Sequence, residues 1–201
     1  MRTLNLAGRH VKLAVMTAVL AGSQSLMAHP HGTVQCGFAI DYRGGQPHRL
    51  TGRLLFDEAH SAQALAVLRD PVTQKLDDAL QLRFLFGLKQ QLARWSWLMT
   101  AAFEGELAEL TQVSDPVLWW SGEGRLGVKV EMAIASTPAI PPGSVWTYSC
   151  QDPSRYWVSE FLQTEAAISV AGCRRAAISP AIKVATGPLA GTVNVNVTCP
   201  P

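Results

Sequence analysis

The sequence predicts an α+β fold, in which a mainly antiparallel sheet has about two helices inserted between an N-terminal hairpin and the later strands. Three observations predict this fold. Apolar and polar residues alternate early in the exported chain, apolar residues then recur at helical spacing from residue 76 to residue 99, and alternation returns from residue 126 onwards. Strands first, helices next and strands last is an order typical of an α+β domain.

Residues 1–28 have the three parts of a secretory signal peptide. Three basic residues precede the apolar residues 13–20, and Ala28 ends a short segment that signal peptidase would cleave. The apolar run is too short to span a bilayer. We therefore predict a mature chain of 173 residues (29–201), exported to the periplasm as a single domain and not itself transmembrane.

The charge of the mature chain argues against two classes of partner. Three of the 17 basic residues and none of the 15 acidic residues lie in the signal peptide, so cleavage changes the formal net charge from +2 to −1. A near-neutral chain gives no sign of the basic surface that binds nucleic acid or an anionic membrane.

All four cysteines lie in the exported part of the chain, and an even number in an exported protein predicts two disulfides. Of the three possible pairings we favour Cys36 with Cys150 and Cys173 with Cys199. The second pair would hold a Gly- and Pro-rich C-terminal segment that has little else to fix it. No Cys-x-x-Cys spacing occurs, which argues against a disulfide oxidoreductase or a cysteine zinc site.

Residues 33–42 and 50–56 predict a β-hairpin, because both segments alternate and a Gly-Gly turn separates them. The apolar face of the first strand is formed by Val34, Cys36, Phe38, Ile40 and Tyr42. Asp57 directly follows the second strand and is expected to cap a helix over residues 59–68.

A second helix is predicted by apolar residues that recur three or four positions apart, namely Leu76, Leu80, Phe84, Leu88, Leu92, Trp95 and Met99. One such stripe is typical of a helix that packs on a core rather than of one that binds a cofactor. The later strands are expected over residues 107–113, 117–120, 126–134, 145–149, 160–170 and 193–197.

Cleavage after Ala28 would place His29 at the N-terminus, which creates a candidate metal site. The freed α-amine, with a pKa of about 7.7 to 8.0, and the imidazole of His29 can chelate one cation, and His31 adds a further nitrogen. Such donors favour Cu(II), Ni(II) or Zn(II) over Ca(II) or Mg(II). Pro30 has no N–H and so excludes the copper mode that uses a deprotonated second amide. The alternative is that both histidines are solvated at a frayed terminus.

Two further candidate ligands lie after the hairpin. His60 follows Asp57 by three residues near a helix start, so that both side chains can face the same way. The alternative is that Asp57 is only a helix cap and His60 a surface residue. Asp41, on the polar face of the first strand, is a candidate hydrogen-bond partner that would orient an imidazole. We expect His48, near the hairpin turn, to be solvated.

Three stretches, taken in order, resemble an uncharacterised bacterial periplasmic family, a domain of unknown function often labelled the periplasmic component of an ABC-type transport system. They are His29-Pro30-His31, residues 56–61 (Phe-Asp-Glu-Ala-His-Ser) and residues 152–156 (Asp-Pro-Ser-Arg-Tyr). The resemblance spans nearly the whole mature chain. It departs from the family at Gly32, where members usually have a large apolar residue, and at residues 70–78, which lack an Asp/Gly-rich segment.

The resemblance implies export, transition-metal handling and a partnership with a metal transporter or permease of the inner membrane. Such proteins are often encoded beside zinc importers or nickel/cobalt exporters, and no catalytic activity is established for them. The resemblance also makes Asp152 a candidate ligand, although an Asp-Pro turn is common for purely local reasons.

We therefore expect a periplasmic accessory protein that binds zinc, nickel/cobalt or copper for a transporter, and not an enzyme. No catalytic or nucleotide-binding motif such as Gly-x-Ser-x-Gly, a phosphate loop or His-Glu-x-x-His occurs. One alternative is a copper-dependent oxidase or mono-oxygenase that uses the N-terminal histidine. The flat aromatic face that it needs would come from Trp119, Trp120, Tyr156 and Trp157. The other alternative is a metal-free accessory subunit that docks on a permease.

Overall fold

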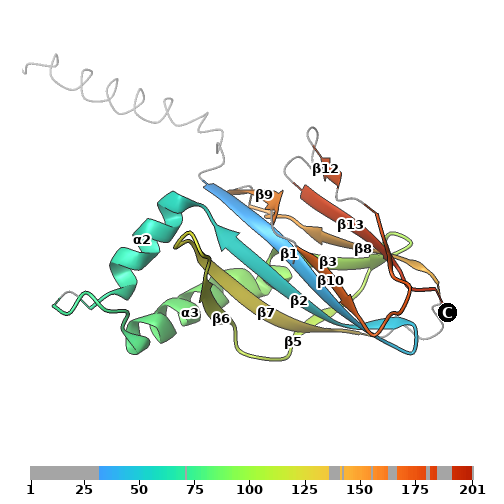
Figure 1. The fold of residues 1–201 in the computed structure, drawn as a ribbon, viewed down its shortest axis with the longest axis horizontal. Coiled ribbons are helices and arrows are strands. Elements are labelled where there is room, and N and C mark those ends of the chain that lie inside the picture. Colours follow the sequence, from blue (N-terminus) through green and yellow to red (C-terminus); the bar gives the residue numbers. More distant parts are fainter. Residues whose placement is uncertain are drawn as a thin grey trace, which may run out of the picture.

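Two mostly antiparallel sheets and two α-helices form the α+β fold in the computed structural model (Figure 1), which confirms the predicted fold class. The predicted signal peptide and the candidate ligands His29 and His31 lie outside the residues that the structure describes. The described residues are 32–70, 72–135, 141, 143–154, 156–162, 167–179, 182–184 and 192–200.

The predicted N-terminal hairpin is confirmed. β1 (Gly32–Arg43) and β2 (Gln46–Phe56) are antiparallel, and Val34 lies opposite Phe56. The five apolar side chains that alternate along β1 are all buried, because a period of two directs one face of a strand into the core.

The first sheet also contains β5 (Leu110–Gln112), β6 (Val117–Trp120), β7 (Leu126–Ile134), β9 (Trp157–Phe161) and β10 (Ile168–Ala171). β7 pairs with β2, and both β5 and β6 pair with the other edge of β7. β9 and β10 pair with successive parts of β1 and run parallel to it. The predicted single strand over residues 160–170 is therefore wrong, since two separate strands share β1 as their partner.

The second sheet contains β3 (Met99–Phe103), β4 (Glu106–Leu107), β8 (Val145–Cys150), β11 (Ala177–Ile178), β12 (Ile182–Val184) and β13 (Thr192–Thr198). β8 lies between β3 and β13. The predicted strand over residues 107–113 is also wrong, because β4 belongs to the second sheet and β5 to the first. The chain passes between the sheets in this segment.

The two sheets share one core, and a disulfide links them through it. Cys36 of β1 is bonded to Cys150 of β8, and both residues are fully buried. Nearby, the hydroxyl groups of Tyr42 and Tyr148 lie 3.4 Å apart. Burial raises the pKa of both phenols, so they remain neutral hydrogen-bonding groups.

The second disulfide joins Cys173 to Cys199, which ties the chain end after β13 to the segment after β10. Both predicted pairings are therefore confirmed. Two disulfides are consistent with a protein of an oxidising, extracytoplasmic compartment.

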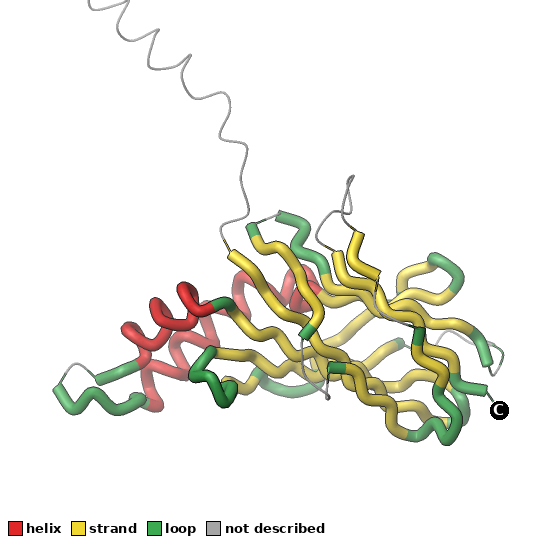
Figure 2. The backbone as a smooth tube through the Cα atoms, turned by 45° about the horizontal axis from the view of Figure 1, so that its top comes forward, coloured by secondary structure: helices red, strands yellow, loops and turns green. Residues whose placement is uncertain are grey.

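The helices α2 (Glu58–Leu68) and α3 (Asp78–Leu92) lie at one end of the first sheet, beside the start of β1 and the end of β2 and far from the β1–β2 turn (Figures 1 and 2). Asp57 is the N-cap of α2, as predicted. The predicted stripe to Met99 does not form one helix, because a 3₁₀ helix, η1 (Ala93–Leu98), follows Leu92 and Met99 begins β3.

Within α3 the predicted apolar stripe faces the core, because Leu92 is buried and Phe84 and Leu88 pack against the core as partly buried residues. Leu82 and Phe86, which lie outside the stripe, are 69% and 63% exposed. Trp97 of η1, rather than Trp95, enters the core. The backbone turns there through left-handed conformations at residues 96–98, which residue spacing does not reveal. Within the described residues, no helix is long and apolar enough to cross a membrane.

Candidate functional site

Asp57 and His60 meet in the first turn of α2. One carboxylate oxygen of Asp57, Oδ1, accepts hydrogen bonds from the backbone N–H of His60 at 2.9 Å and from His60 Nδ1 at 2.8 Å. The other oxygen, Oδ2, accepts the backbone N–H of Thr33 in β1 at 2.8 Å. Asp57 therefore ties the first turn of the helix, the imidazole and the first strand together.

These hydrogen bonds keep Asp57 ionised. Burial alone would raise the pKa of its carboxyl group, but the N–H groups of His60 and Thr33 and the His60 imidazole together hold that pKa below its ordinary value. An ionised carboxylate can only accept hydrogen bonds, so Nδ1 of His60 must be the donor. In neutral His60 the proton is then on Nδ1, and Nε2 carries a lone pair that Asp57 does not use.

The residues around this pair fix its position. Asp57 N–H donates to the carbonyl of Thr33 at 3.1 Å. The hydroxyl group of Ser61 donates to the carbonyl of Phe56 at 3.3 Å and accepts the N–H of Leu126 at 3.0 Å. The first turn of α2 is thus held to β1, to the end of β2 and to the start of β7, and His60 is carried on a rigid support.

Two aromatic residues lie against His60. The Trp157 ring, at the start of β9, is centred 4.3 Å from the imidazole, and the Tyr156 ring is centred 6.1 Å from it with an edge-on geometry. The side chains of His60 and Asp57 are still 19% and 27% exposed. The pair is therefore partly exposed to solvent although rings pack against it.

Gly32 is where β1, α2 and β9 come together. A Cβ atom at this position would lie 2.5 Å from Cε1 of His60, 2.6 Å from Cζ3 of Trp157 and 2.8 Å from Oδ2 of Asp57. Any side chain would displace one of these groups. Gly32, the position where the sequence differs from the family it resembles, thus lets the backbone of β1 pass directly beside the imidazole of His60.

Asp152 closes the turn that precedes β9. Its Oδ1 accepts the N–H and the hydroxyl group of Ser154 at 2.8 and 2.7 Å, and its Oδ2 accepts the N–H of Trp157 at 2.9 Å. The residue is 3% exposed. These hydrogen bonds show Asp152 as a turn residue that positions Trp157. They agree with the local interpretation of the Asp-Pro turn and do not require Asp152 to be a metal ligand.

Asp41 and His48 lie away from this site. Asp41 is nine residues after Gly32 on β1, roughly 30 Å along the strand, and its carboxylate lies 3.9 Å from Arg43. His48 precedes Phe56 by eight residues on β2, about 26 Å along the strand. The structure does not bring Asp41 to His60, and the carboxylate that orients an imidazole is that of Asp57.

The four aromatic residues considered for an oxidase do not form one face. β1, β2 and β7 lie between β9 and β6, which separates Trp157 from Trp119 by about four strand spacings, or roughly 19 Å. Trp119 instead lies over Gly127, where a Cβ atom would overlap its indole. This separation removes one support for the oxidase alternative.

In the part of the chain that the structure describes, no three His, Cys, Asp or Glu side chains gather as a metal site. The structure therefore brings Asp57 and His60 together and leaves Asp41 and His48 elsewhere.

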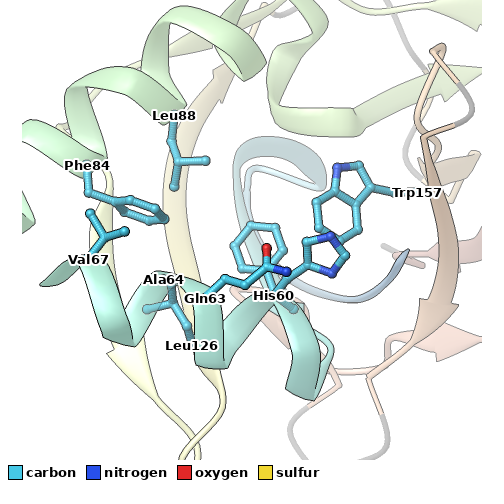
Figure 3. A pocket seen from close by; sticks show the side chains of 9 residues that line it. His60, Gln63, Ala64, Val67, Phe84, Leu88, Leu126 and Trp157 are labelled. Carbon is cyan, nitrogen blue, oxygen red and sulfur yellow. The ribbon is translucent and has the colours of Figure 1, made fainter. Parts of the chain in front are cut away.

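A cavity of about 260 Å³ lies beside His60 between α2 and α3 (Figure 3). The residues that line it are Phe56, His60, Gln63, Ala64, Val67, Phe84, Leu88, Leu126 and Trp157. The sequence pattern did not indicate it, because apolar residues at helical spacing look the same whether they fill a core or surround a space.

Neither a protein-family model nor a curated protein matches the chain. The resemblance to a periplasmic family of transport systems therefore stays a prediction.

Proposed function

We propose that this protein binds a divalent transition metal, either zinc, nickel/cobalt or copper, in the periplasm as an accessory protein of a metal transporter. The observation that carries the proposal is the hydrogen bond from His60 Nδ1 to the Asp57 carboxylate. Histidines that bind metals commonly donate their second ring nitrogen to a carboxylate, which fixes the tautomer and makes the imidazole a better ligand.

The order of the chain supports the same proposal. Gly32 lies directly beside His60, and one peptide bond joins Gly32 to His31. In the sequence, the three nitrogen donors of His29 and His31 therefore lie within three residues of Gly32. With Nε2 of His60 they would supply up to four nitrogen ligands.

This donor set fits the proposed metals. Imidazole and amine nitrogens suit zinc, nickel and copper, whereas calcium and magnesium prefer oxygen. Asp57 would fix the tautomer of His60 rather than bind the metal itself, since both of its carboxylate oxygens already accept hydrogen bonds. Binding would release protons and weaken in acid, because each nitrogen must be unprotonated to bind.

The test is a metal titration of the mature protein and two histidine variants. His60→Ala removes the proposed ligand and should lower the affinity for the preferred metal by at least about tenfold. His48→Ala is the matched control, because His48 lies about 26 Å away along β2, and should leave the affinity unchanged. Equal affinities of His60→Ala and the unaltered protein would refute the role of His60.

A further inference from the structure

The cavity beside His60 is lined by residues of five elements of the fold. Phe84 and Leu88 project from α3 towards Ala64 and Val67 of α2 (Figure 3). The strands β2 and β7 contribute Phe56 and Leu126, and β9 contributes Trp157. The apolar side chains of two helices thus line a pocket that is open to solvent.

The size of this space suits a small molecule. An engineered apolar cavity of about 150 Å³ in another protein binds benzene. The cavity here has a volume of about 260 Å³, so it has room for one aromatic ring with one or two small substituents. It falls just below the range of about 300 to 1,000 Å³ that is usual for drug-sized ligands.

The walls favour an aromatic occupant. The rings of Phe56 and Trp157 are centred 5.3 Å apart, and the His60 ring is centred 4.3 Å from Trp157. Phe84 adds a further ring from α3. Aromatic molecules gain from edge-on or offset contacts with such rings in addition to the burial of their own apolar surface.

One polar group on the wall favours a hydroxyl on that ring. His60 and Gln63 are the polar residues among those that line the cavity. Because Asp57 accepts the Nδ1 proton of His60, neutral His60 offers Nε2 as a hydrogen-bond acceptor. A phenolic O–H is a donor of the right size for this acceptor.

We propose that the cavity binds a small monocyclic phenol, with its ring between α2 and α3 and its hydroxyl group donated to His60. This inference goes beyond the metal proposal and does not depend on it. A metal on Nε2 would remove the acceptor, so the two ligands would compete for His60, but only the phenol needs the apolar walls.

The test uses the mature protein in buffer that contains EDTA, with 4-methylphenol and toluene as probes in calorimetric titrations. Toluene has the same ring and methyl group but no hydroxyl. Both probes should bind saturably, and 4-methylphenol should bind roughly tenfold more tightly because of one hydrogen bond to the imidazole. Failure of 4-methylphenol to saturate the protein would overturn the proposal.

Two variants separate the cavity from the acceptor. Val67 lines the cavity and is 62% exposed, so the fold can accept a larger side chain there. Val67→Phe adds bulk at the cavity wall and should weaken the binding of both probes at least about fivefold. His60→Phe keeps a ring but removes the acceptor, and should make the two affinities equal. Val72→Phe is the control, because Val72 is 88% exposed and does not line the cavity, and should change neither affinity.

The same variants distinguish this proposal from the metal proposal. Val67→Phe should retain the full metal affinity, whereas His60→Phe should lose it. If 4-methylphenol binds the unaltered protein and Val67→Phe leaves its affinity unchanged, the molecule binds elsewhere and the cavity proposal is wrong. If the unaltered protein binds metal but does not bind 4-methylphenol, only the cavity proposal is contradicted.

Discussion

At the scale of single residues, Asp57 connects local structure to the candidate site. Its carboxylate caps α2, accepts the N–H of Thr33 in β1 and orients the imidazole of His60. The sequence allowed the cap and the spacing to be predicted, because an aspartate before a helix and a residue three positions later are local relations. It did not reveal the bond to Thr33, which joins residues 24 positions apart.

The lowered pKa of Asp57 predicts a pH-dependent contribution to stability. A carboxyl group whose pKa is lower in the folded than in the unfolded protein stabilises the fold above its unfolded pKa of about 3.9. This contribution is lost as the pH falls through the folded pKa. Asp57→Asn should therefore lower the free energy of unfolding by about 1 kcal/mol at pH 6, and by less at pH 3.

Urea unfolding of both proteins between pH 3 and pH 7 measures this difference. Asp115→Asn is the matched control, because the side chain of Asp115 is 88% exposed and forms only a surface ion pair with Lys89. The control should change stability by less than about 0.5 kcal/mol. A cost of Asp57→Asn that did not vary with pH would show that ionisation of this carboxyl group contributes nothing to stability.

At the scale of elements, the beginning of β1 matters because two elements far along the sequence pack against it. Gly32 pairs with Trp157 of β9 in a parallel register and faces the first turn of α2. Alternation in the sequence predicted β1 but not this pairing, since parallel partners are chosen by long-range contacts that no local window contains. For the same reason, β9 and β10 were predicted as one strand.

The tight space at Gly32 predicts the effect of a side chain there. Gly32→Val should displace the His60 ring or the Trp157 ring, lower the free energy of unfolding by about 1 to 3 kcal/mol and weaken metal binding. The measurements are urea unfolding, the NMR shifts of the His60 imidazole and a metal titration. Gly122→Val is the control, because no atom lies within 4 Å of a Cβ built there. Unchanged imidazole shifts in Gly32→Val would contradict the packing described here.

At the scale of the whole molecule, the disulfide between Cys36 and Cys150 joins the two sheets across their shared core. The even number of cysteines predicted two disulfides, and the need to hold the C-terminal segment favoured the pairing that the structure has. The sequence did not show that the first bond would connect two sheets. Nor did it show that α3 would leave a cavity, because that depends on how α2 and α3 pack together.

The two disulfides should differ in their contribution to stability. Cys36 and Cys150 are 114 residues apart and Cys173 and Cys199 only 26, so the first bond restricts the unfolded chain more. Replacing the first pair by alanine should cost about 4 to 5 kcal/mol and replacing the second about 3.5 kcal/mol. Urea unfolding of the two double variants measures both values. A larger cost for the second pair would contradict this ranking.

The proposal that the N-terminal histidines and His60 bind one transition metal is tested most directly by a competition titration with Cu(II), Ni(II) and Zn(II). It compares the mature protein with a version that carries one extra alanine before His29. We expect tight binding of at least one metal by the mature protein and a loss of that affinity in the extended protein, because the added residue removes the His29 amine. Equal affinities in the two proteins would contradict it.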